Sequence, residues 1–483
     1  MQAGQAAIRR RASSRARGPG QPAAMVTSSG RWLWFRAASD PFRLVLAFII
    51  LIDISRIHQQ FGFLQPFRPA LLSFLVGVGL AVLKPKYLDW RNLKETWHPK
   101  AVVVLTGIAL LSVPFGISLG GSAVFFLDVY SKILVTAFLI LAGIRTPEHL
   151  KLIVWTYVIC CGIWIIMAFT VFDLQPAGDQ MRLADLHAFD ANDLGLVLVV
   201  GIPLTLWMMH GSNGLTKLLL VSIILGIGAT IALTGSRGAL VGLSATAAAL
   251  LFLSRHVSAP KRLGSIAVMA LGLVVTAPPG YWEQMGTILN PQDDYNMTAP
   301  VGRKAIVLRG LSYIGQYPIF GLGMNNFGRA EGTIGRTEDA RSGIGVAWIA
   351  PHNTYVQVGA ELGLFALVIW LSLLMAGIVG LAKLRNRLPR RWLKGTPRQQ
   401  FLYTGTIFVP ASFVAFAASS VFLSFAYLLP IYLLVGIMTT IHIFVKRELR
   451  EEQRLVEAPP ALVLPERRVI GGPLRTPRGT ILR

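Results

Sequence analysis

The chain has 483 residues, of which 53% are hydrophobic and only 14% are charged, and its formal net charge is +23. Soluble domains carry about 25% charged residues, so a chain this apolar cannot cover its surface with polar groups and requires surrounding lipid. The net charge would suit a nucleic-acid partner, but the Lys and Arg residues lie mostly in tails and short loops between apolar segments, which argues against nucleic acid and for a membrane protein.

The first segment, residues 1–41, is predicted to be a disordered basic tail followed by an interfacial anchor. Its basic run, Arg9 to Arg17, is followed by Gly, Pro, Ser and Ala rather than by an apolar stretch, so it is not a signal peptide. In the stretch 31–36, Arg31 and Arg36 flank a group of aromatic residues, which is typical of a segment at headgroup depth. Met25 is an alternative start to Met1.

The segment 42–446 is predicted to be an all-α polytopic transmembrane domain. A span needs about 20 apolar residues, and about twelve segments approach that length: 42–56, 68–84, 101–118, 122–144, 151–172, 194–210, 216–234, 238–254, 263–279, 353–382, 402–419 and 424–445. The tenth is unusually long.

The orientation of these spans follows from the loops between them. Every second loop is rich in Lys and Arg, beginning with the loop 84–100 and ending with 383–398, and both tails are basic. The intervening short loops carry few basic residues, with Arg56 and Arg68 as the main exceptions. The positive-inside rule therefore predicts that both termini are cytoplasmic.

Three features are then predicted to lie on the outer face: the loop 173–193, the tight turn 234–238 and the long loop 280–352. A loop as long as 280–352 is usually functional or disordered. Its apolar residues recur at helical spacing from Ala305 to Ile314, which predicts short helices on the membrane surface. The C-terminal tail 447–483 is charged and then Pro-rich, and is predicted to be disordered and cytoplasmic.

Arg237 breaks the positive-inside pattern at the predicted outer start of a span. It lies between Gly235 and Gly238, where glycine lets a ligand approach the backbone and a helix N-terminus offers free N–H groups. A guanidinium added there can grip two phosphate oxygens at once. The alternative is an interfacial Arg whose side chain reaches the lipid headgroups.

Two more arginines share this outward placement. Arg303 precedes the helical stretch of the long loop, and Arg182 lies in the loop 173–193. Each is either a further phosphate ligand or an ordinary solvated charge.

His352 lies at the predicted outer start of the span 353–382, where an imidazole could take a proton from a sugar hydroxyl near neutral pH. The alternative is a histidine in the headgroup layer. Tyr355 would share its helix face, whereas Glu361, nine residues on, would lie on roughly the opposite face. We therefore expect Glu361 to bond within the bundle rather than to pair directly with His352.

Neither a metal site nor a cofactor is expected. The two cysteines, Cys160 and Cys161, are adjacent within one apolar span, so we interpret them as buried small apolar residues. No outer acidic pair has metal-site spacing, and the chain contains no Walker loop, zinc motif or Gly-rich Rossmann turn.

Four pieces of sequence, in order, resemble the O-antigen ligase/polymerase family. They are Arg182-Leu183-Ala184-Asp185 through Ala191-Asn192-Asp193, the Ser-Arg-Gly turn within 233–239, Gly302-Arg303 through Tyr317-Pro318-Ile319-Phe320-Gly321-Leu322-Gly323, and Pro351-His352-Asn353-Thr354-Tyr355 through Glu361-Leu362-Gly363. They cover about residues 180–365, the family-like core; the N-terminal spans match only in hydropathy.

The resemblance implies a metal-independent, inverting glycosyltransferase of the GT-C type in the bacterial inner membrane. Such a protein takes a glycan from an undecaprenyl-diphosphate carrier on the periplasmic face and passes it to another glycan, to lipid A–core or to a protein. By resemblance, Arg237, Arg303 and Arg182 bind the diphosphate and Arg237 also acts in catalysis. His352 activates the acceptor hydroxyl. Secondary candidates are Asn353, Tyr355, Glu361 and Asn192.

Three alternatives remain open at this point. Within the family, the sequence does not separate a ligase from a polymerase. A transporter or flippase for lipid-linked glycan would have Gly/Pro-broken spans in both halves and a central charge pathway, whereas here the polar candidates gather on one face. A cell-wall polymerase of another GT-C lineage would use an outer acidic residue, with Asp190 and Asp193 as the residues to test.

Overall fold

The structure is a computed structural model that describes residues 40–177, 180–184, 186–187, 189–254, 257–290, 292, 302–335 and 349–457. The predicted N-terminal tail and anchor therefore lie outside the described residues, except for Asp40 and Pro41. The same holds for most of 291–301, for 336–348 and for the C-terminal tail from 458.

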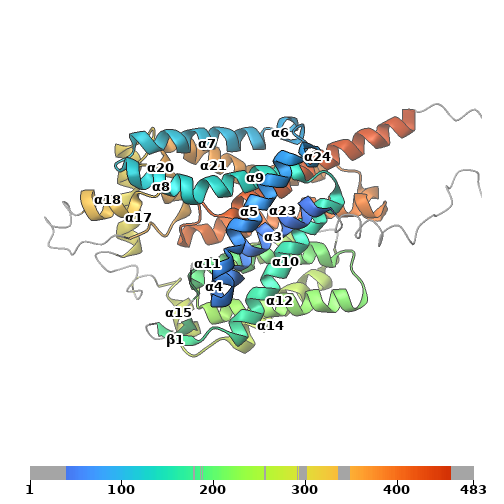
Figure 1. Ribbon diagram of the computed structural model, residues 1–483. Helices are drawn as coiled ribbons and strands as arrows, with labels where there is room; N and C mark the ends of the chain where they lie inside the picture. The colour runs from blue at the N-terminus through green and yellow to red at the C-terminus, as the bar shows by residue number, and fades with distance from the viewer. Residues whose placement is uncertain are drawn as a thin grey trace, which may run out of the picture.

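The described chain is helical apart from one short hairpin (Figure 1). The elements of the first half are α3 (Pro41–Ser55), α4 (Ile57–Gln60), η1 (Gly62–Phe67), α5 (Pro69–Leu83), η2 (Pro85–Tyr87), α6 (Asn92–Glu95), α7 (His98–Phe115), α8 (Leu119–Phe125), η3 (Phe126–Tyr130), α9 (Ser131–Gly143), α10 (Pro147–Thr170), β1 (Leu174–Ala177), β2 (Gln180–Leu183) and α11 (Ala191–Met209).

The elements of the second half complete the bundle. They are α12 (Gly214–Thr234), α13 (Arg237–Leu253), α14 (Ala259–Thr276), α15 (Tyr281–Gly286), α17 (Arg303–Gln316), α18 (Phe327–Ala330), η5 (Glu331–Gly335), α20 (Thr354–Leu362), α21 (Leu364–Met375), η6 (Ala376–Gly380), α22 (Leu381–Arg387), η7 (Arg390–Lys394), α23 (Pro397–Ser419), η8 (Ser420–Phe422) and α24 (Leu429–Glu457).

Within the described residues, ten stretches are long and apolar enough to cross a membrane, which confirms the predicted all-α polytopic membrane protein. Each of the twelve predicted spans falls on helix, although 353–382 and 122–144 each cover more than one helical element. α3, with 15 residues, and α13, with 17, lie outside these ten stretches, whereas α5, also of 15 residues, forms one of them together with η1. α11 and α24 form the centre of the bundle, since 89% of the span window of each is buried, against 17% for α14.

Small residues allow the central helices to approach closely. A Cβ atom at Gly195 of α11 would lie 2.6 Å from the Cβ of Ala239 on α13, and one at Gly405 of α23 would lie 2.6 Å from the Trp207 ring. Close packing of this kind drives helix association in lipid, where the hydrophobic effect between helices is absent. The two cysteines of α10 are buried and unbridged, as predicted.

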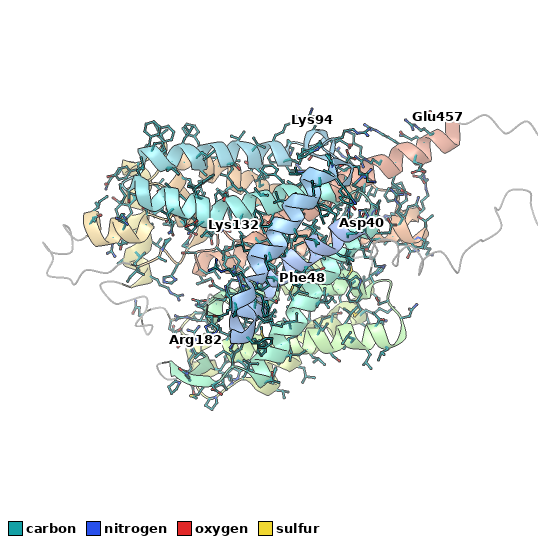
Figure 2. The ribbon with its side chains drawn as sticks, viewed as in Figure 1. Asp40, Phe48, Lys94, Lys132, Arg182 and Glu457 are labelled. Carbon is teal, nitrogen blue, oxygen red and sulfur yellow. The ribbon has the colours of Figure 1, made fainter. Side chains whose placement is uncertain are left out.

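The helix ends separate into two groups. α17 and α18 lie at the opposite end of the bundle from the C-terminal end of α24 (Figure 1). Arg182 lies far from Lys94 and Glu457 (Figure 2), which come from segments predicted to face the other way. We call the end that holds β2, the N-terminus of α13 and α17 the motif end, and the other end the basic-loop end.

Three predictions about element boundaries are corrected. The predicted span 353–382 is two helices, because the chain breaks at Gly363, whose φ is +87°. The loop 173–193 contains the antiparallel hairpin β1–β2, in which Leu174 pairs with Leu183. α24 continues to Glu457, so the tail predicted to begin at 447 starts with helix; Arg447 there bonds to Glu95 and Asn92 on α6.

The long loop 280–352 contains short helices, as predicted: α15, α17, α18 and the π-turn η5. Tyr313 and Phe327 belong to a small hydrophobic core of their own that also includes Val356 of α20. The buried carboxylate of Glu331 accepts hydrogen bonds from Arg309 Nε at 2.9 Å and from the Tyr313 hydroxyl at 2.8 Å. A bidentate, buried ion pair of this kind fixes the relative position of α17 and η5.

Candidate functional site

The turn between α12 and α13 is held by its own side chains. Gly235 adopts a left-handed φ of +58°, and a Cβ there would lie 2.7 Å from Oε1 of Gln180 on β2. The Thr234 hydroxyl accepts from the Ser236 N–H at 3.2 Å, and the Ser236 hydroxyl caps α13 by accepting from the Ala239 N–H at 3.1 Å. The hairpin β1–β2 therefore lies directly on this turn, and Arg182 is placed beside it.

Arg237 is the first residue of α13. Its Nη1 donates to the Thr287 hydroxyl at 2.8 Å, and that hydroxyl in turn donates to the Gln284 carbonyl at 2.8 Å. The guanidinium is thus held against the segment that follows α15. Its position at a helix N-terminus adds the positive end of the helix dipole to its own charge.

Asp190 caps the helix that begins on the other side of the hairpin. Its carboxylate accepts from the N–H groups of Asn192 at 2.7 Å and Asp193 at 2.8 Å, while the Asp193 carboxylate accepts from the Asp190 N–H at 3.1 Å. This reciprocal capping box fixes the Asp190 side chain at the motif end. The residue itself remains exposed.

His352 precedes α20 in a left-handed conformation with a φ of +45°, which is unusual for a residue other than glycine. Burial lowers the pKa of its imidazole, the charge of Arg303 lowers that pKa further, and the carboxylate of Asp190 opposes the shift. The neutral imidazole is therefore favoured, which is the form that can accept a proton.

The predicted charged residues are close enough to act on one another's pKa. Burial lowers the pKa of the Arg182 guanidinium, Asp190 opposes this shift, and Arg237 adds to it. Together with the effects of Arg303 and Asp190 on His352, these couplings join residues from β2, α11, α13, α17 and the start of α20. The carboxylate of Asp190 thus acts on both Arg182 and His352, while Arg237 acts on Arg182 and Arg303 acts on His352.

An open cavity of about 620 Å³ lies at one side of this cluster. It is lined by residues between Arg182 and Ala191, including His187, Phe189 and Asp190. Its volume is in the range of small-molecule sites, which is about 300–1,000 Å³. A polar ligand placed there would meet the guanidinium of Arg182 and the carboxylate of Asp190 together.

The secondary candidates at the start of α20 and α11 have structural contacts. The Asn353 side chain caps α20 by accepting from the N–H groups of Tyr355 and Val356 at 3.0 and 3.1 Å. The Tyr355 hydroxyl donates to the Ala417 carbonyl at 2.8 Å, and the Asn192 amide donates to the Asp190 carboxylate at 3.2 Å. These residues position their neighbours in the site.

Glu361 lies at the other end of α20 and has no hydrogen bond to His352. Its buried carboxylate accepts from the N–H groups of Asn325 at 3.1 Å and Phe327 at 3.0 Å, and from the Tyr427 hydroxyl at 2.7 Å. Glu361 thus bonds within the folded protein, as the sequence indicates. It anchors the chain that enters α18.

The Pro-x-x-Gly-x-Gly segment serves the same end of α20. The N–H groups of Leu322 and Gly323 donate to the last helical carbonyls, Ala360 at 2.7 Å and Glu361 at 3.0 Å. The Pro318 carbonyl accepts from the Leu364 N–H at 2.8 Å. The motif therefore caps a helix C-terminus, where carbonyls otherwise lack partners.

Sequence reasoning about the site passed over two residues. The sequence indicates Asp190 only as a candidate for a cell-wall polymerase of another GT-C lineage, whereas in the structure its carboxylate acts on the pKa of both Arg182 and His352. Arg56, at the end of α3, lies with its guanidinium carbon 5.1 Å from the centre of the Phe189 ring, next to Asp190. Arg56 breaks the positive-inside pattern as Arg237 does, so the same argument could have identified it.

In the part of the chain that the structure describes, no group of three or more His, Cys, Asp and Glu side chains could hold a metal ion. Residues 220–371 match the family model described as O-Antigen ligase. This match supports the predicted assignment to the O-antigen ligase/polymerase family, and three of the four motif pieces lie inside it; the piece containing Arg182 precedes it. No curated protein matches the chain.

Proposed function

An O-antigen ligase domain spans residues 220–371 of this chain, and on that premise we propose that the protein transfers a glycan from an undecaprenyl-diphosphate carrier to an acceptor on the periplasmic face. An O-antigen ligase-like membrane glycosyltransferase needs a lipid-linked glycan, an acceptor and a membrane setting. The ten apolar spans supply the last of these. The observation that carries the rest of the proposal is the gathering of three arginines and one histidine at the motif end.

The arginines suit the donor. A lipid diphosphate is a good leaving group, and the reaction mainly needs neutralisation of the negative charge that develops on its departing oxygen. Arg237 at the N-terminus of α13 and Arg303 at the N-terminus of α17 combine fixed charges with the positive ends of two helix dipoles. Arg182, beside Arg237, adds a third guanidinium. Such a site stabilises the departing diphosphate without requiring a metal ion.

His352 suits the acceptor. In the proposed step the acceptor hydroxyl oxygen forms a bond to the anomeric carbon as the bond from that carbon to the diphosphate oxygen breaks. The hydroxyl proton passes to the imidazole of His352, and the carrier diphosphate leaves with the bonding electron pair. A single displacement of this kind inverts the anomeric carbon. The lowered pKa of His352 supports this role, because the imidazole is then neutral before the step.

The test is glycan transfer by purified protein supplied with lipid-linked glycan and with one acceptor class at a time: a second carrier-linked glycan, lipid A–core or a protein. Product with the first acceptor identifies a polymerase, and product with either of the others identifies a ligase. If no acceptor yields product while carrier-linked glycan crosses the bilayer of a proteoliposome, the protein is a flippase and the proposal is wrong.

Arg237→Ala should lower the transfer rate about 10²–10³-fold, which is typical of removing one donor to a developing oxyanion. Arg237→Lys should also be impaired, because an ammonium cannot bind two oxygens in a fork. Arg329→Ala is the matched control, since Arg329 is an exposed arginine on α18 at the same end. Full activity of Arg237→Lys would contradict a bidentate grip on the diphosphate.

A further inference from the structure

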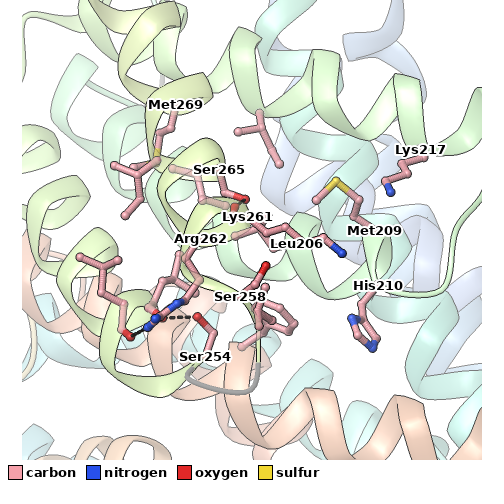
Figure 3. Close-up of a pocket in the computed structure, with 17 residues that line it drawn as sticks. Leu206, Met209, His210, Lys217, Ser254, Ser258, Lys261, Arg262, Ser265 and Met269 are labelled. Atoms are coloured by element: carbon pink, nitrogen blue, oxygen red, sulfur yellow. Dashed lines mark hydrogen bonds between the residues drawn. The ribbon is translucent and has the colours of Figure 1, made fainter. Parts of the chain in front are cut away.

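A second cavity, of about 450 Å³, lies at the basic-loop end among α11, α12, α13 and α14, of which α11 and α13 also lead to the site (Figure 3). It is bordered by the end of α11, the start of α12, the end of α13 and the start of α14. α12 has 21 residues, so its two ends are about 30 Å apart at 1.5 Å per residue. The cavity is therefore separate from the candidate active site.

α12 and α14 approach each other closely at the inner end of the cavity. Gly228 of α12 lies against the Met269 carbonyl of α14, and a Cβ at Gly272 of α14 would lie 3.1 Å from the Ala229 nitrogen. Met269 is itself a lining residue, and the other described residues that line the cavity make no glycine contact of this kind. The helices therefore leave a space there, and Met269 closes its inner end.

The walls of this space are apolar and its rim is basic. Leu206, Met209 and Ile266 are among the apolar lining residues. Lys217 of α12 and Lys261 of α14 are both exposed, and their side chains extend toward the same space (Figure 3). None of the described residues that line the cavity is acidic.

Arg262 lines the cavity, but its guanidinium bonds to the protein backbone. Its Nη1 donates to the Leu251 carbonyl at 2.5 Å, at the C-terminal end of α13. Helix C-terminal carbonyls lack intrahelical partners, so this bond caps α13 and fixes one wall. Among the described residues that line the cavity, Lys217 and Lys261 are exposed lysines that a ligand phosphate could reach.

We propose that this cavity binds one anionic diacyl phospholipid, with an acyl chain between α11, α12 and α14 and the headgroup phosphate between Lys217 and Lys261. An apolar wall with a basic rim and no acid matches both parts of such a lipid. Basic pockets between transmembrane helices bind acidic headgroups at the membrane surface. A free phosphate would leave the apolar walls unfilled, so the lipid is the favoured source of the phosphate.

The experiment is native mass spectrometry of the purified full chain titrated with phosphatidylglycerol, with phosphatidylcholine as the uncharged-headgroup comparison. We expect one phosphatidylglycerol to bind in preference to phosphatidylcholine. The double variant Lys217→Gln/Lys261→Gln should bind it about tenfold more weakly or worse. Lys383→Gln/Lys394→Gln removes the same charge at the same end but outside the cavity, and should bind as the wild type does.

Met209→Trp tests the apolar half, because it narrows the cavity while leaving both lysines in place; it should weaken binding as well. Elution volume and melting temperature like those of the wild type show that each variant is folded. Equal binding of the two lipids, equal losses in the two double variants, or displacement of phosphatidylglycerol by millimolar inorganic phosphate would each overturn the proposal.

Discussion

His352, just before α20, and Glu361, nine residues later near its C-terminal end, differ in exposure, in backbone conformation and in hydrogen bonding. At the start of α20, His352 is partly exposed, has a left-handed backbone and lies within the electrostatic influence of Arg303 and Asp190. At its end, Glu361 is 2% exposed and accepts three hydrogen bonds, two from backbone N–H groups. One residue is placed where a ligand can reach it, and the other is enclosed.

This difference indicates how the short helix α20 can fix the position of the His352 side chain. Glu361 and the Pro-x-x-Gly-x-Gly segment fix the C-terminal end of α20 to α18, while Asn353 caps the N-terminal end. The backbone strain at His352 then persists because the structure on both sides of it is over-determined. The residue proposed for catalysis and the residue that anchors the chain thus lie at opposite ends of one element.

Removing the imidazole of His352 tests most directly whether the two ends of α20 have different roles. His352→Ala should lower glycan transfer about 10²–10⁴-fold, the usual contribution of a general base, and should leave membrane insertion unchanged. His352→Asn is the better-matched variant, because asparagine tolerates a left-handed φ and cannot take the proton. Both should be compared with wild type in transfer rate and in melting temperature.

A normal glycan ladder from cells that express either variant would remove His352 from the chemistry. A large fall in the melting temperature of His352→Asn would also contradict the proposed role of His352 as a base. It would mean that His352 stabilises the fold, as Glu361 does.

The second test addresses the other end of α20. Glu361→Ala leaves the N–H groups of Asn325 and Phe327 without their acceptor, at about 1–3 kcal/mol for each buried unsatisfied group. The melting temperature should fall markedly, and transfer should fall only as far as the folded fraction does. Glu361→Gln keeps one acceptor oxygen and should lose less. Glu283→Ala, at an exposed position of α15, is the control.

If Glu361→Ala keeps its melting temperature and loses transfer, the carboxylate acts in the reaction and the contrast between the two ends disappears.

Much of the fold could be predicted because lipid imposes long apolar helices and the loops carry a charge bias. All twelve predicted spans fall on helix, even where the helix is short, as in α3 and α13. Hydropathy does not predict the break at Gly363, because 353–382 is apolar enough on average to be assigned as one span although it contains Gln357 and Glu361. The break depends on Pro318, whose carbonyl accepts from Leu364, and such a contact between distant residues leaves no local signal.

The site was partly predictable for a related reason. An arginine in a loop predicted to face outward breaks the positive-inside pattern, and this exception predicts Arg237 and Arg303 as candidate site residues. Arg56 is the same kind of exception, so the same argument makes it a candidate. Asp190 lacked any such signal, because an acidic residue before an apolar run is also what a helix cap requires. Only the folded structure shows that the charge of this capping carboxylate opposes the lowering of the pKa of both Arg182 and His352.

The smallest expected effect is the most specific test of the start of α20. Asp190 raises the pKa of His352 and Arg303 lowers it. Asp190→Asn should therefore lower that pKa and move the acidic limb of the kcat/KM profile to lower pH, because the neutral base then persists further into acid. Arg303→Gln should move the limb to higher pH. Asparagine caps helices as well as aspartate does, so α11 should stay intact.

Opposite displacements separate an electrostatic effect on one base from general damage. Either variant can lower the overall rate, Arg303→Gln through weaker diphosphate binding, but a change in rate alone leaves the position of the limb where it was. The limb of kcat/KM reports the free protein, so substrate affinity does not disguise it. Displacements in the same direction, or none in either variant, would mean that the titrating base is a group other than His352.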